Sequence, residues 1–214
     1  MQDCLLCCAE SGRDLVCGAC AADLPDLPEH CPQCAMPSPG SAVCGGCLQH
    51  PPSFDLTLAL WRYEFPCDRL VQALKYHSRL ALAGFFARAL LHRRRPSADL
   101  IIPMPLHLKR LAGRGFNQAV EIARVLARSS AIALALGAVR RIRHTAPQTE
   151  LPYDARAKNV RGAFACALDL TDSSVIVIDD VMTTGATLNE FAATLKRAGA
   201  ARVESWVVAR TLPR

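Results

Sequence analysis

The sequence has few aromatic residues and no long apolar run. Phe, Trp and Tyr make up 6% of its 214 residues, so the stacking platforms of single-strand binders are not evident. Charged residues interrupt every apolar stretch before the roughly 18–20 residues that a membrane span needs. We therefore expect no membrane insertion, and a globular chain with one medium domain and a small one.

The first ten residues, MQDCLLCCAE, lack the basic start and apolar core of a secretory signal peptide. We therefore expect a cytoplasmic protein, and a reducing compartment favours metal binding over disulfides as the use of its many cysteines. The Gly-x4-Gly-Lys-Ser/Thr pattern of P-loop proteins does not occur, which argues against an NTPase.

Nine of the eleven cysteines lie in the first 50 residues and include four Cys-x-x-Cys pairs. Such a pair directs two thiolates at one metal ion, and two pairs complete a tetrahedral site. The four pairs therefore predict a double zinc ribbon over residues 1–50, with two zinc ions. We expect these ions to be structural, because the segment has almost no core of its own. Sequential pairing is the simplest, and interleaved pairing stays open. The predicted ligands are Cys4, Cys7, Cys17, Cys20, Cys31, Cys34, Cys44 and Cys47.

The charge of the chain is divided unevenly. Residues 1–50 contain one basic and six acidic residues, whereas the remainder contains 24 basic and 13 acidic ones. The basic body favours anionic ligands, either phosphates or nucleic acid. The acidic ribbon is expected to dock on protein, with the body itself as one candidate. Cys8 is an alternative ligand to Cys7, and Cys67 and Cys166 are expected to be small core residues.

The linker HPPSF (50–54) separates this ribbon from residues 55–214, because consecutive prolines continue neither a helix nor a strand ladder. The body then alternates between strand and helix patterns, which predicts an α/β fold with a parallel sheet flanked by helices. Strands are expected at 56–63, 99–105, 175–178 and 202–209, with weaker ones at 138–142 and 163–165. Helices are expected at 67–77, 80–95, 117–129 and 187–198.

The segment 175–187, VIVIDDVMTTGAT, predicts a binding site for a phosphorylated ribose. An apolar strand leads into a loop that opens a helix, where free backbone N–H groups and the helix dipole favour an anion. Carboxylates beside a phosphate cradle suit the hydroxyls of a sugar attached to that phosphate. The predicted ligand-binding residues of this segment are Asp179, Asp180, Thr183, Thr184, Gly185, Ala186 and Thr187, and Thr187 is also a candidate helix cap.

This segment resembles the phosphoribosyl pyrophosphate (PRPP) motif of type I phosphoribosyltransferases, and the body looks like one branch of them, the ComF family of competence-associated proteins. The stretches 101–127 and 145–164 carry the resemblance to the branch, through GFNQ (115–118), PQT (147–149) and NVRG (159–162). The resemblance covers nearly the whole chain. It implies the type I phosphoribosyltransferase fold, and PRPP bound together with Mg²⁺.

The resemblance also implies two further parts of the site. The turn PMP, with Met104 at its centre, looks like the loop whose backbone meets the pyrophosphate. The segment 109–118 resembles a basic flap, with Lys109, Arg110 and Arg114 as its cations. Cations and Mg²⁺ suit a highly charged leaving group. A solvated basic loop before a helix is the alternative for any one of these basic residues.

Three functions stay open. The first is a Mg²⁺-dependent phosphoribosyltransferase, for which no residue stands out as the acid or base for a particular acceptor. The second, implied by the resemblance, is a competence factor for DNA uptake in natural transformation, acting on single-stranded DNA with helicase or recombination partners. Its candidate contacts are the clusters Arg93–Arg95, Arg140/Arg141/Arg143 and Arg156/Lys158/Arg161. The third is a non-catalytic PRPP sensor.

Overall fold

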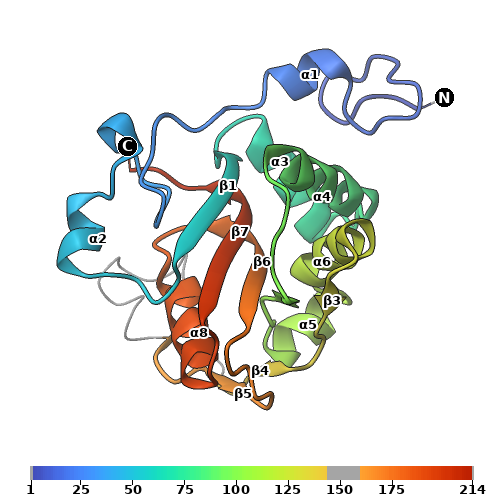
Figure 1. Cartoon of the computed structure of the whole chain (residues 1–214). Coiled ribbons are helices and arrows are strands. Elements are labelled where there is room, and N and C mark those ends of the chain that lie inside the picture. The colour runs from blue at the N-terminus through green and yellow to red at the C-terminus, as the bar shows by residue number, and fades with distance from the viewer. Residues whose placement is uncertain (1, 144–159, 214) are drawn as a thin grey trace.

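The computed structural model describes residues 2–143 and 160–213, and a five-stranded parallel sheet forms the centre of this part of the chain (Figure 1). The strand order is β1-β7-β6-β2-β3, and every neighbouring pair is parallel. Parallel neighbours need crossover connections, which helices supply here. The strands are β1 (Leu56–Arg62), β2 (Leu100–Pro103), β3 (Ala133–Leu134), β6 (Ser174–Met182) and β7 (Arg202–Arg210).

Helices cover both faces of this sheet, as the alternating pattern predicted (Figure 1). Ile176 and Ile178 of β6 pack with the helices of one face, and Val175 and Val177 pack with α8 on the other. This division follows from the alternation of side chains along a strand. The first face carries α3 (Cys67–Tyr76), α4 (Ala81–Arg93) and α6 (Gln118–Ser130); the second carries α8 (Ala186–Arg197).

Strand β7 has eight of its nine residues buried, because it lies between β1 and β6 and is covered on both faces. Glu204 is buried within it and is 5% exposed. Its carboxylate accepts hydrogen bonds from Trp206 Nε1 at 3.0 Å, from Arg202 Nε at 3.1 Å and from Arg94 Nη2 at 3.3 Å. A buried carboxylate is stable here because cationic and indole donors surround it.

Several elements differ from the sequence prediction. The two weak strands form β4 (Val139–Arg141) and β5 (Phe164–Cys166), which pair antiparallel outside the main sheet. The helix α5 (Leu108–Arg114) and the two-residue strand β3 were not predicted. Residues of α5 are not buried, so the helix leaves no apolar periodicity in the sequence. No helix in the described ranges is long and apolar enough to cross a bilayer.

The N-terminal 50 residues contain three short helical turns: α1 (Gly18–Ala22), η1 (Pro39–Ser41) and α2 (Gly45–Gln49) (Figure 1). The segments between these turns contact the body directly, since Asp26 lies 2.7 Å from Arg93 and the backbone N–H of Thr57 donates to the carbonyl of Pro32. The expected docking of an acidic segment on the basic body therefore has a counterpart in the Asp26 ion pair. The boundary between residues 50 and 55 stays a prediction.

Candidate functional site

The two acids of the predicted ribose site lie inside strand β6, not beyond its end. Pairing with β7 continues to Met182, so the strand is four residues longer at its C-terminal end than the apolar run 175–178 predicted. Consecutive residues of a strand point to opposite faces. Asp180 therefore shares the face of Ile178, and Asp179 shares the face of Val177.

Asp180 is buried and bound by two side chains from the helices of its face. Lys75 Nζ of α3 lies 3.0 Å from its Oδ1, and Gln118 Nε2 of α6 donates to its Oδ2 at 2.6 Å. The side chains of Lys75 and Asp180 are 18% and 6% exposed. Burial lowers the pKa of Lys75, but the negative charge of Asp180, its hydrogen bond to Lys75 and the charge of Asp179 together outweigh burial and raise that pKa. Lys75 therefore keeps its positive charge at neutral pH.

The cavity contacts of Lys75 and Gln118 were not predicted from the sequence. Lys75 follows Cys67 and Val71 at intervals of four residues, and both are buried on the inner face of α3. A lysine on the apolar face of a predicted helix is the sequence signal that could have indicated a buried, paired role for Lys75. Gln118 belongs to the GFNQ motif but its carboxamide gave no indication of an acidic partner.

Asp179 differs from its neighbour. Its Oδ1 accepts the backbone N–H of Asp180 at 2.8 Å. Burial and the charge of Asp180 raise the pKa of Asp179 to about 7, although Lys75 and Arg141 act in the opposite direction. Asp179 therefore carries only part of its negative charge at neutral pH.

The loop after β6 turns sharply at Gly185, which adopts a left-handed conformation with φ 81° and ψ −5° and precedes the first residue of α8. Glycine suits this conformation because it has no Cβ. The expected cap at Thr187 is wrong: Thr187 lies within the helix, and the hydroxyl of Thr184 accepts the N–H of Ala186 at 3.2 Å instead. A side chain caps only from a position before the helix, where it reaches the free N–H groups.

The turn after β2 lies beside the acids. The backbone N–H of Met104 donates to the carbonyl of Ile178 at 2.8 Å, and Asn117 Nδ2 donates to the carbonyl of Met104 at 2.9 Å. The Oδ1 of Asn117 accepts the N–H of Ala119 at 3.0 Å and so caps α6. One asparagine therefore fixes the PMP turn relative to a helix start.

The predicted flap forms α5 and closes against α3. The Arg114 guanidinium lies 5.5 Å from the ring centroid of Tyr76, and its Nη1 donates to Gln118 Oε1 at 2.7 Å. Through Gln118, Arg114 belongs to the same network as Asp180. A cation on an aromatic face contributes about 0.5–1 kcal/mol at an exposed site.

These elements enclose a cavity of about 450 Å³. Of the predicted ligand-binding residues, the cavity is lined by Met104, Arg110, Arg114, Asp179, Asp180, Thr183 and Thr187. The cavity is not lined by four other predicted residues, Lys109, Thr184, Gly185 and Ala186. The last three form the turn between β6 and α8. The predicted segments 103–105, 109–118 and 179–187 are therefore neighbours in space. The cavity combines carboxylates, cations and a helix start, which suits a ligand with both hydroxyl and phosphate groups.

A second hollow, of about 770 Å³, adjoins the first and shares Pro105, Leu106 and Arg141 with it. Its walls are largely apolar and come from α5, α6 and the segment that leads into β4. Leu108 and Ile142 are among its residues and are 76% and 60% exposed. The site thus has a polar half and an apolar half side by side.

The basic clusters are only partly available to a polyanion. Arg93 and Arg94 pair with Asp26 and Glu204. Arg140 is exposed, whereas Arg141 is partly buried over the ring of Phe164, 5.5 Å from its centroid. The motif 147–149, Arg156, Lys158 and Asn159 lie outside the described residues.

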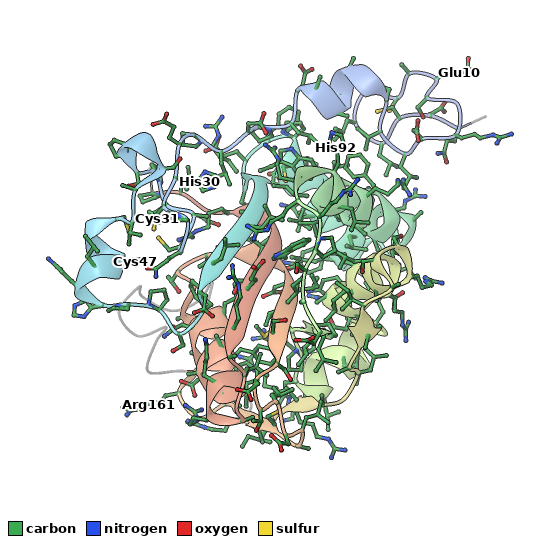
Figure 2. All side chains as sticks on the ribbon, in the orientation of Figure 1. Glu10, His30, Cys31, Cys47, His92 and Arg161 are labelled. Atoms are coloured by element: carbon green, nitrogen blue, oxygen red, sulfur yellow. The ribbon has the colours of Figure 1, made fainter. Side chains whose placement is uncertain are left out.

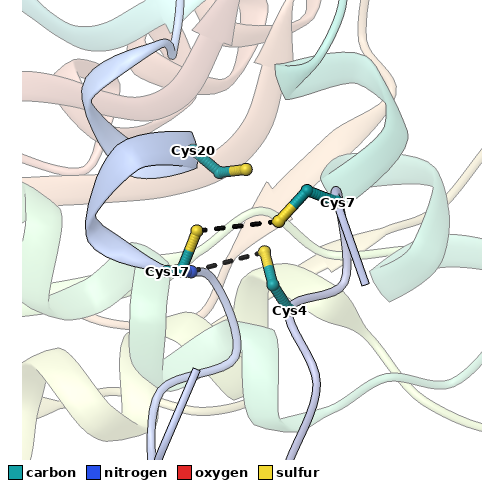
Figure 3. Close-up of side chains that lie close together, drawn as sticks. All are labelled: Cys4, Cys7, Cys17 and Cys20. Atoms are coloured by element: carbon teal, nitrogen blue, oxygen red, sulfur yellow. Dashed lines mark hydrogen bonds between the residues drawn. The ribbon is translucent and has the colours of Figure 1, made fainter. Parts of the chain in front are cut away.

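The eight predicted zinc ligands gather into two clusters of four. The first consists of Cys4, Cys7, Cys17 and Cys20, and the second of Cys31, Cys34, Cys44 and Cys47. Within each cluster the four sulfur atoms lie within 4.8 Å of one another, and Figure 3 shows the first. Four thiolates at 2.3 Å from one zinc ion would be about 3.8 Å apart. The grouping is sequential, and the interleaved alternative is not found.

The sulfur atoms are held by backbone N–H groups, as in metal-binding knuckles. The N–H groups of Leu6 and Cys17 lie 3.5 and 3.3 Å from Cys4 Sγ. Burial raises the pKa of the Cys4 thiol, but these N–H groups outweigh it and lower the pKa to about 6. The thiolate is the form that binds a metal ion. Cys8 lies outside the cluster, and Cys67 is fully buried, as expected of a core residue.

The second cluster, whose Cys31 and Cys47 are labelled in Figure 2, is linked to the loop after β6 by Arg210. Arg210, at the end of β7, is 3% exposed and its Nε donates to the carbonyl of Cys34 at 2.9 Å. Its Nη1 donates to the carbonyls of Met182, Thr183 and Thr211. One guanidinium therefore joins a cysteine knuckle to the start of the loop.

Comparisons with known proteins find relatives over most of the chain. Residues 111–212 match the phosphoribosyl transferase domain. The chain is 35% identical to the DNA utilization protein YhgH of Salmonella typhi over 206 residues, which cover 92% of this chain and 91% of that protein. It is 30% identical to competence protein F of Haemophilus influenzae over 205 residues, which cover 91% and 84%.

Solved structures with a similar arrangement include an allosteric regulatory enzyme of purine biosynthesis, at 18% identity and a TM-score of 0.43, over 64% of this chain and 30% of that one. A purine phosphoribosyltransferase from Pyrococcus horikoshii follows at 20% identity and a TM-score of 0.37, over 62% and 82% of the two chains.

Proposed function

The chain belongs to the ComF family, that of competence protein F and the DNA utilization protein YhgH, and from this premise we propose that it binds PRPP in the 450 Å³ cavity and acts in DNA uptake. The observation that carries the proposal is the convergence of Asp179, Asp180, the Thr183–Thr187 loop and the PMP turn on one cavity. Carboxylates serve the ribose hydroxyls, and the loop at the start of α8 serves the 5-phosphate.

Mg²⁺ fits this site as a companion of the ligand. Both carboxylate oxygens of Asp180 already have partners in Lys75 and Gln118, so the pair is not a ready cage for a bare ion. Mg²⁺ commonly binds through substrate phosphates and keeps several waters. We infer that it arrives on the pyrophosphate of PRPP, near the cations of α5, where it would offset the charge of the phosphates.

The two cysteine clusters are proposed to hold one structural zinc ion each. The sulfur-only ligand sets, their spacing and the backbone N–H groups at Cys4 support zinc over harder ions. Structural zinc contributes on the order of 10–16 kcal/mol to the folding of small metal-binding segments.

Calorimetry with PRPP and Mg²⁺ tests the main proposal. Wild type should bind at micromolar concentration, and Asp179→Asn should bind at least about tenfold more weakly, because a carboxamide accepts a hydrogen bond from a hydroxyl less strongly than a carboxylate does. Asp172→Asn is the matched control, because Asp172 is exposed and lies just before the N-terminal end of β6, whereas Asp179 lies near its C-terminal end. Equal binding by Asp179→Asn and wild type would contradict the assignment of the site.

Whether transfer follows binding is a separate question. Release of pyrophosphate in the presence of a panel of bases and amines would establish a phosphoribosyltransferase, and the apolar hollow beside the cavity is where we would place the acceptor. Binding without release with any acceptor of the panel would favour the non-catalytic PRPP sensor.

Direct binding of single-stranded DNA is the second candidate, favoured by the exposed Arg140 and Arg143 beside the apolar hollow. The names of the relatives, a competence protein and a DNA utilization protein, also suit it. A mobility shift that weakens with salt, and weakens further in Arg140→Ala/Arg143→Ala, would support this candidate. No shift at low salt would leave helicase or recombination proteins as the partners to search for.

A further inference from the structure

Lys75 is a cavity residue that lies outside both the PRPP motif and the matched domain. It belongs to the last turn of α3, whereas the domain match begins at residue 111. Its ammonium group nevertheless lines the cavity together with Asp179 and Thr187. Lysine is almost never buried without a charged partner, and here the partner is Asp180.

Two helices hold the Asp180 carboxylate from the same side. Lys75 contacts Oδ1 at 3.0 Å and Gln118 contacts Oδ2 at 2.6 Å, so rotation of the carboxylate is restricted. An ionised carboxylate has about four acceptor positions on its two oxygens. Each oxygen can therefore still accept a hydroxyl group from a ligand in the cavity.

Lys75 also balances the charge of the acid pair. Two adjacent carboxylates in a cavity repel each other, and proteins commonly place a divalent cation beside such a pair. Here a side-chain cation takes that place at hydrogen-bonding distance from Asp180. The raised pKa of Asp179 reduces the charge of the pair further near neutral pH.

We propose that Lys75 is the positioning residue of the acid pair: it fixes and neutralises Asp180, so that a phosphorylated ribose binds without a metal ion held by the two carboxylates. The proposal rests on the proposed function of the cavity. It predicts that the ribose 5-phosphate half of the ligand binds independently of Mg²⁺, and that only the pyrophosphate half calls for the ion.

Ribose 5-phosphate is the probe, because it has no pyrophosphate to chelate Mg²⁺. Binding is measured by calorimetry on the full chain, once with EDTA and once with Mg²⁺. Wild type should bind equally in both. Lys75→Met should bind at least about tenfold more weakly in EDTA, and Mg²⁺ should restore part of the loss by taking the place of the ammonium group. Lys75→Arg should stay within about threefold of wild type, since it keeps the charge and a donor.

Lys196→Met is the matched control. Lys196 also forms an ion pair, 2.8 Å from Asp55, but it lies at the far end of α8 and does not line the cavity. This variant should bind ribose 5-phosphate as wild type does. If Mg²⁺ partly restores ribose 5-phosphate affinity in Lys75→Met but has no effect on Lys196→Met, Lys75 has more than a structural role.

A wild type that binds ribose 5-phosphate only with Mg²⁺ would overturn the proposal, as would Lys75→Met with unchanged affinity in EDTA. A wild type that binds neither ribose 5-phosphate nor PRPP would instead refute the proposed function itself.

If Lys75→Met does not fold because it leaves Asp180 buried and unpaired, the neutral pair Lys75→Met/Asp180→Asn replaces it. Asp180→Asn alone should weaken the binding of ribose 5-phosphate, and the double variant should bind no more weakly than Asp180→Asn. A further loss in the double variant would show that Lys75 acts independently of Asp180.

Discussion

The two cysteine clusters have the same four-cysteine pattern but different surroundings. The first meets the body through apolar packing, where Cys4 and Val16 belong to the same buried cluster as Leu70 of α3. The second is hydrogen-bonded to β1 through Pro32, and through Cys34 to Arg210, which also donates to the loop after β6. The same four-cysteine unit therefore packs on the helices of the body in one place and supports the loop after β6 in another.

Disrupting the second cluster should have the largest effect. Cys31→Ser/Cys34→Ser should lower the zinc content from two ions to one and abolish PRPP binding, because the Cys34 carbonyl would no longer hold Arg210 in place. Zinc content by mass spectrometry and PRPP affinity by calorimetry check this. Cys4→Ser/Cys7→Ser should lose one zinc ion as well but keep PRPP affinity within about threefold. Similar losses of affinity in both variants would remove the distinction.

Cutting the connection without touching the metal sharpens the comparison. Arg210→Met should keep both zinc ions but leave buried carbonyls without a donor, at about 1–3 kcal/mol for each. We expect a lower melting temperature and PRPP binding weaker by about tenfold or more. Arg202→Met, on the same strand but half-exposed at its other end, should leave PRPP affinity unchanged. Unchanged PRPP affinity in Arg210→Met would mean that the loop after β6 keeps its conformation without Arg210.

Two glycines with left-handed backbone conformations allow the effect of a substitution on stability to be distinguished from its effect on PRPP binding. Gly185→Ala strains a residue at φ 81° and places its Cβ against Met182, so it should cost about 1–2 kcal/mol and weaken PRPP binding severalfold. Gly12→Ala, beside the first cluster at φ 66° and with open space around it, should cost about 1 kcal/mol and leave binding intact. Thermal unfolding and calorimetry on both variants give the comparison.

The smallest effect concerns pH on the loop side of the comparison. The pKa of Asp179 is about 7 in the folded chain and near 3.8 when unfolded, so the folded state binds more protons between these values. Stability from this group is therefore greatest below pH 4 and falls as pH rises to 7, by on the order of 1 kcal/mol between pH 5 and 7 after allowance for partial exposure. Asp179→Asn should flatten this part of the curve in urea unfolding.

Most helices and strands of the body could be predicted from the sequence, whereas the order of the strands in the sheet was not predicted. Helix α6 was predicted from its apolar positions, and Asn117 caps it. The residue pattern of α5 gave no such signal, because its side chains face solvent and the cavity.

The site shows the same limit. Asp179, Asp180 and Thr183 are near one another in sequence, so the motif located them. Lys75 and Arg210 reach the site from α3 and from the end of β7, and only the folded sheet places them there. Pairing across 105 residues or 27 residues leaves no local pattern to detect.

The strand order has a consequence for attempts to shorten this protein. The stretch that matches the phosphoribosyl transferase domain begins after β2, yet β2 lies between β6 and β3, and β1 covers the outer edge of β7. A fragment cut at residue 111 would lose one strand from the interior of the sheet and another from its border, along with the turn at Met104 and the ammonium group of Lys75. It would expose unpaired strand edges, which promote aggregation. The residues that match the family domain are therefore fewer than the residues that the sheet needs in order to fold. A shortened protein should begin no later than β1.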